Sequence, residues 1–153
     1  MTSTAAQRRY IATEAAIGAS ISAVLSILFV LLLFGGMAQV PVRGLLVDAL
    51  PQGFAIALMA TLVPTLLARR RLARGVVTPI SQDSSARSWG LIPRALLAGL
   101  SAAAVGALLT AILLPMGIAT LPLSIVLIVK GAWGFMLGGF VAAAMTRVAL
   151  AGG

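Results

Sequence analysis

One basic run, Arg69-Arg70-Arg71-Leu72-Ala73-Arg74, divides an otherwise apolar chain into two halves. Lys and Arg residues next to membrane-spanning segments stay on the cytoplasmic side, so the run predicts a cytoplasmic loop over 70–92. The composition fits a membrane protein, because 61% of the residues are hydrophobic and only 9% are charged. Soluble domains carry about 25% charged residues. We therefore expect one all-α membrane domain, 1–153, in which this loop separates two pairs of helices.

Four apolar stretches predict the membrane-spanning helices. About 20 helical residues, at 1.5 Å each, cover the roughly 30 Å hydrocarbon core of a bilayer. The stretches are about 15–34, 53–68, 95–114 and 131–148. The residues before the first stretch, 1–7, are small and polar and predict a disordered tail.

The basic residues fix the expected orientation. Nine of the eleven Lys and Arg residues fall on the side of the central loop, namely Arg8, Arg9, Arg69, Arg70, Arg71, Arg74, Arg87, Arg94 and Arg147. Arg43 and Lys130 fall on the other side. Because positive charge is retained inside, this distribution predicts a multi-pass protein with both termini in the cytoplasm.

Two segments that begin on the outer side are open to two interpretations each. The apolar residues of 42–50 have helical spacing, which predicts a short interfacial helix or, equally well, an ordinary loop. The segment 122–148 is either an interfacial helix followed by a span or one long tilted helix. Pro64 interrupts the second span, and we expect Thr61 and Thr65 to bond the carbonyl of Ala60 that it leaves free.

A constant shift of 81 residues aligns glycine and proline residues of the two halves without a gap. It superposes Gly18 on Gly99, Gly36 on Gly117, Pro41 on Pro122 and Gly53 on Gly134. The shift predicts a duplicated helical hairpin, with one unit over about 11–69 and the other over about 93–150. Since both units start on the same side, they form a parallel repeat about an axis normal to the membrane.

The stretch Leu50-Pro51-Gln52-Gly53-Phe54-Ala55-Ile56-Ala57-Leu58-Met59, followed by Pro64 and the arginine run, resembles small uncharacterised bacterial inner-membrane proteins. Those proteins share a two-helix module that ends in a proline and a basic pair. The resemblance covers mainly the first half of the chain. It implies the same helical fold and a location in the bacterial inner membrane, and it implies no mechanism.

The residue types leave little material for catalysis. The chain has no His and no Cys, which excludes imidazole triads, thiol chemistry and the usual zinc sites. Its carboxylates are Glu14, Asp48 and Asp83, and Glu14 and Asp48 are expected on opposite sides of the bilayer. We therefore expect no enzyme, cofactor or metal site. The net charge of +8 is attributed to topology and not to nucleic-acid binding.

Small residues and charges supply the candidate structural sites. Gly131, Gly134 and Gly138 lie on the last span at spacings that let helices approach closely, either within one bundle or between subunits. Arg94 and Arg147 are expected near Glu14, because all three are at cytoplasmic helix ends. The repeat brings the outer segments together, which predicts a contact between Asp48 and Lys130 that offsets the cost of burying the lysine.

These features support two hypotheses about function. The first is a structural or accessory component of the membrane that acts through helix packing. The alternative is a subunit of a small oligomeric transporter or channel with a path near Thr61, Pro64 and Thr65. The expected partners are the bilayer itself, another membrane protein or a second copy of the chain. Anionic lipid headgroups are expected at one further set of residues, Arg69, Arg70, Arg71 and Arg74.

Overall fold

The computed structural model describes residues 4–77 and 90–151, and in these ranges the chain forms four helices and two short strands. In chain order they are α1 (Ala5–Phe34), β1 (Gln39–Pro41), α2 (Val42–Ala73), α3 (Leu91–Ala111), β2 (Thr120–Pro122) and α4 (Leu123–Leu150). The expected all-helical architecture is confirmed. Three helices, α1, α2 and α4, are long and apolar enough to cross a membrane, and α3 holds a shorter apolar stretch, Ala95–Ala111.

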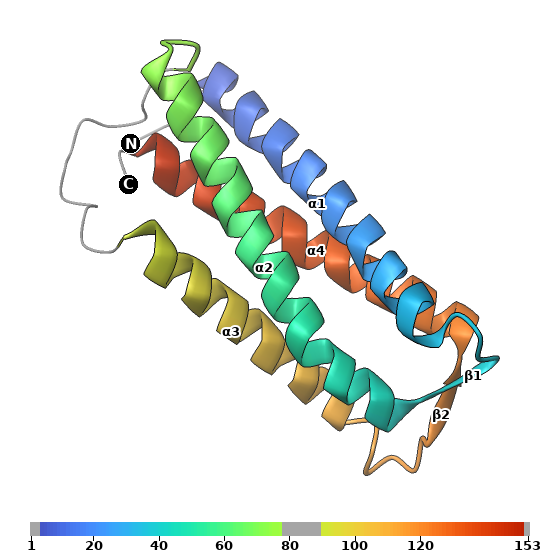
Figure 1. Cartoon of the computed structure of the whole chain (residues 1–153). Coiled ribbons are helices and arrows are strands. Elements are labelled where there is room, and N and C mark those ends of the chain that lie inside the picture. Colours follow the sequence, from blue (N-terminus) through green and yellow to red (C-terminus); the bar gives the residue numbers. More distant parts are fainter. Residues whose placement is uncertain (1–3, 78–89, 152–153) are drawn as a thin grey trace.

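The helices lie side by side in a bundle with two distinct ends (Figure 1). At one end, called the arginine end because it carries the run from Arg69 to Arg74, α1 begins and α2 and α4 end. At the opposite end, called the ribbon end, β1 and β2 pair with each other as a two-stranded ribbon. Packing does not follow sequence order: α1 packs mainly on α4, α3 packs mainly on α2, and α2 also contacts α4. The two helices of one half therefore do not form a self-contained hairpin.

Helix boundaries differ from the expected ones in two places, and in a third the structure decides between two alternatives. Residues 4–7 are not a disordered tail, because Thr4 caps α1 in a reciprocal capping box with Gln7. The segment 42–50 is neither a separate interfacial helix nor a loop. It is the first part of α2, which continues through both Pro51 and Pro64. For 122–148 the long-helix alternative is the correct one, since α4 starts at Leu123.

A two-stranded ribbon, absent from the sequence-based expectation, holds the ribbon end together. β1 pairs with β2 in antiparallel register, with Val40 opposite Leu121. The first N–H groups of α2 and α4 have no acceptor within their own helices. The Val42 amide donates to Ala119 O at 3.0 Å, and the Leu123 amide donates to Ala38 O at 3.1 Å. The residues just before the two strands thus cap both helices, neither of which has a side-chain cap.

Candidate functional site

The ribbon end contains a buried ion pair between α2 and α4. Lys130 Nζ lies 2.7 Å from Asp48 Oδ2, and the side chains are 12% and 1% exposed. The contact expected between these residues is therefore present. A cluster of Val30, Phe34, Val40, Leu45 and Val126 packs at the same end of the bundle. Exclusion of water strengthens the attraction between the two charges and makes either charge costly without the other.

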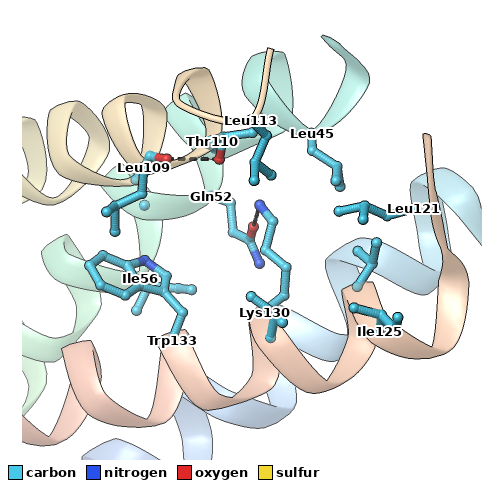
Figure 2. A pocket seen from close by; sticks show the side chains of 15 residues that line it. Leu45, Gln52, Ile56, Leu109, Thr110, Leu113, Leu121, Ile125, Lys130 and Trp133 are labelled. Carbon is cyan, nitrogen blue, oxygen red and sulfur yellow. Dashed lines mark hydrogen bonds between the residues drawn. The ribbon is translucent and has the colours of Figure 1, made fainter. Parts of the chain in front are cut away.

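Gln52, which the sequence analysis did not assign to a site, connects this ion pair to a third helix. Its Oε1 accepts a hydrogen bond from Lys130 Nζ at 2.6 Å, and its Nε2 donates to Ser26 O on α1 at 3.2 Å. Figure 2 shows the Lys130 and Gln52 side chains pointing toward each other. One polar cluster, Asp48–Lys130–Gln52, therefore joins α1, α2 and α4. The sequence does contain a signal for this contact, because Gln52 lies one helical turn after Asp48 and on the same helix face.

The arginine end has its own ion pair, with a partner that differs from the expected one. Arg71 Nη1 lies 2.6 Å from Glu14 Oε1 and links α2 to α1. The guanidinium also lies over the ring of Tyr10, 5.2 Å from its centroid, within the range of a cation–π contact. Arg147 is exposed instead of pairing with Glu14, because its place on α4 turns it outward. The side chain of Arg94 lies outside the described part of the structure.

Both ion pairs use α2, and their separation matches a bilayer. Asp48 and Arg71 are 23 positions apart on one continuous helix, which corresponds to about 34 Å at 1.5 Å per residue. A hydrocarbon core is roughly 30 Å thick. The separation of the two pairs along α2 is thus close to that thickness, and each pair anchors α2 to a different neighbouring helix.

The predicted packing glycines all face α1 inside the bundle. A Cβ on Gly134 would collide with Ser26, and one on Gly138 would collide with Ser22. Gly131 faces Ile27, where an added Cβ would be 3.3 Å from the isoleucine side chain. Close approach of α1 and α4 therefore depends on these glycines, in the manner of small-residue interfaces in membranes.

Thr61, Pro64 and Thr65 are buried in α2. They line neither the cavity beside Lys130 nor the hollow beside Phe140. Thr61 Oγ1 donates to Ala57 O at 2.8 Å, and Thr65 Oγ1 donates to Thr61 O at 2.7 Å. The expectation that these hydroxyls bond the Ala60 carbonyl is wrong. Each threonine instead bonds the carbonyl four residues before it, as buried hydroxyls in helices commonly do.

The arginine end carries an exposed basic surface. Its exposed members come from the start of α1 and the ends of α2 and α4, namely Arg8, Arg9, Arg69, Arg70, Arg74 and Arg147. Glu14, the one carboxylate described at this end, is buried. Asp83, Arg87 and the rest of the central loop over 78–89 lie outside the described residues. The described surface is strongly positive, as a surface in contact with anionic headgroups would be.

Within 4–77 and 90–151, no three His, Cys, Asp or Glu residues lie close enough to hold a metal ion. Asp48 and Glu14 are at opposite ends of the bundle, so they do not form an acid–base pair. The polar chemistry of the described bundle is thus concentrated in the two ion pairs. Comparison of the chain with protein-family models, with curated proteins and with solved structures gave no match.

Proposed function

We propose that this chain is a structural or accessory component of the bacterial inner membrane, crossing it four times and acting through helix packing. The main support is that two ion pairs, about 34 Å apart along α2, fix this helix to its neighbours. They leave the middle of α2 with apolar and small residues and with hydroxyls bonded to their own helix. Such a bundle is suited to hold a fixed shape against a partner in the membrane.

The orientation belongs to the same proposal. The exposed basic surface lies at the arginine end, where both the first helix begins and the last one ends. With positive charge retained inside, both termini are cytoplasmic and the ribbon faces outward. The apolar stretch of α3, Ala95–Ala111, is 17 residues long, which is at the short end of the range for a spanning helix.

An internal duplication about a two-fold axis is also proposed. Under the shift of 81, Val40 corresponds to Leu121, and these residues are opposite each other in the ribbon. The bond from Val42 to Ala119 O and the bond from Leu123 to Ala38 O then become equivalent. The α1–α4 and α3–α2 interfaces also become equivalent under this shift. These equivalences support a repeat whose units exchange helices and do not stand as separate hairpins.

The alternative, a subunit of a small transporter or channel, draws on a different observation. Buried oxygen atoms without hydrogen-bond partners occur along the described interior, at Ser26 Oγ, Asp48 Oδ1 and Thr146 Oγ1. Unsatisfied buried polar atoms are costly and often mark functional sites. Together with Thr61 and Thr65 they are the groups that a path for protons or small ions would use.

Reconstitution into liposomes distinguishes the two functions. The purified chain, in vesicles loaded with a pH-sensitive dye and placed under a potassium diffusion potential, is expected to give the same proton leak as empty vesicles. The Asp48→Asn variant serves as the matched control, because a true proton path would lose its flux there. A wild-type flux above the leak that disappears in Asp48→Asn would reject the structural role and favour the transporter.

A further inference from the structure

A cavity of about 150 Å³ lies beside the polar cluster, between α2, α3 and α4. Its wall is mostly aliphatic, with Leu45 and Ile56 from α2, Leu109 and Leu113 from the α3 side and Ile125 from α4. Figure 2 shows these side chains surrounding the space into which Lys130 extends. The cavity is distinct from the ion pair, because it is the neighbouring space that the lysine and Gln52 border on one side.

The cavity opens toward the face of the bundle that would contact lipid. α3 and α4 have few contacts with each other in the described ranges, so they form the two sides of a groove with α2 as its floor. Leu109 on one side and Ile125 and Val129 on the other are 49%, 46% and 59% exposed. An apolar molecule dissolved in the bilayer therefore has a lateral route into the groove.

The polar side chains at the cavity offer hydrogen-bond donors, and the charge of Lys130 is balanced by Asp48. A lysine ammonium has three N–H groups, and Lys130 uses two of them for Asp48 and Gln52. The third remains for a ligand. Trp133, one turn further along α4, also lines the cavity, and its indole N–H is a further donor there. Since Asp48 already neutralises Lys130, the wall suits an uncharged acceptor better than an anion.

The size of the space favours a ring with a long tail. An apolar protein cavity of about 150 Å³ holds one benzene ring. Trp133 also lines a second apolar hollow, of about 250 Å³, which continues along the groove past Leu137 and Phe140 to Met145. Lys130 and Met145 are 15 positions apart on α4, or about 22 Å along its axis. That length suits an extended hydrocarbon chain.

We propose that this groove binds a lipid of the isoprenoid quinone class. The ring occupies the cavity beside the Trp133 indole, with one carbonyl accepting from Lys130 Nζ and the other within reach of an indole N–H donor. The isoprenoid tail lies in the second hollow. This site goes beyond the proposed packing role, and its failure would leave that role standing.

Fluorescence quenching tests the site, because quinones quench a nearby indole. The full-length Trp89→Phe variant keeps Trp133 as the sole tryptophan of the two in the chain. In nanodiscs, a short-chain ubiquinone is expected to quench it saturably, and equilibrium dialysis of the same quinone gives an independent affinity. The variant Gly106→Leu fills the cavity from α3, where an added Cβ has no neighbour closer than 3.8 Å. It is expected to weaken binding about tenfold in both assays.

The matched control is Ala104→Leu, which adds the same side chain at an exposed position of α3 and is expected to bind as the parent does. Ile125→Phe, which fills the cavity from α4, serves as a second blocking variant if Gly106→Leu folds poorly. Equal binding in the blocking and control variants would overturn the proposal. So would displacement of the quinone by equimolar monoolein, whose ester carbonyl lacks the ring.

Discussion

Each end of the bundle joins α2 to another helix through an ion pair, but the two pairs differ in their exposure to solvent. At the ribbon end, Asp48 is buried and the Lys130 side chain is only 12% exposed, and Gln52 ties the pair to a third helix. At the arginine end, Glu14 is buried but Arg71 is 41% exposed and rests on Tyr10. A pair largely removed from water has little hydration to replace a lost partner, whereas an exposed guanidinium keeps its hydration. The comparison predicts that the ribbon end is the more sensitive to mutation.

The largest effect is expected at Asp48. Asp48→Lys places two buried cations together, and its cost should exceed the roughly 3–5 kcal/mol of breaking a buried pair. Lys130→Met leaves the carboxylate unpaired, but an acid can take up a proton, so we expect a smaller loss. Thermal unfolding in detergent measures both. The exchanged double variant, Asp48→Lys with Lys130→Asp, should regain part of the loss. If it is no more stable than the worse single variant, the direct pairing is wrong.

Gln52→Leu is expected to have an intermediate effect. It removes two hydrogen bonds, each worth about 0.5–1.5 kcal/mol, while keeping the side chain similar in size. Gln39→Leu is the control, since this glutamine is exposed in the ribbon. Unfolding in detergent should therefore show a loss for the first variant alone. Equal stabilities would mean that Gln52 does not connect the three helices energetically.

At the arginine end, Arg71→Met is expected to cost only about 1 kcal/mol, because the guanidinium is 41% exposed and ion pairs open to solvent contribute little. Added salt should reduce the difference between wild type and variant, since the Debye length falls to about 3 Å at 1 M. The corresponding difference for Lys130→Met should be nearly independent of salt. Arg70→Met, on the same helix but exposed, provides the control. A salt-independent loss at Arg71 would show that the two ends are alike.

The two ends also differ in how far the sequence predicts them. The contact of Asp48 with Lys130 followed from the shift of 81 and from the small number of charges on that side. The partner of Glu14 did not follow, because Arg71, Arg94 and Arg147 are all expected at the same face. Which of them meets Glu14 depends on how each helix is rotated about its axis. That rotation is set by packing, including the glycine contacts between α1 and α4.

The helix boundaries give a similar lesson. Pro51 and Gly53 suggested that a new helix starts there, yet α2 runs through them. Proline costs a helix one hydrogen bond, and contacts with neighbouring helices offset that cost in a membrane bundle. The ribbon was also missed, since three-residue strands give no alternating pattern. Apolar length predicts helices reliably, whereas contacts between distant segments decide their ends.

We propose that the two ion pairs mark opposite faces of the membrane. The chain has no cysteine, so single cysteines provide clean reporters. Val47, beside Asp48, and Val76, just beyond Arg71, are 71% and 69% exposed. A membrane-impermeant maleimide should label Val47→Cys in intact cells and Val76→Cys only in inverted vesicles. Labelling of both positions from the same side would show that the two ion pairs do not mark opposite faces.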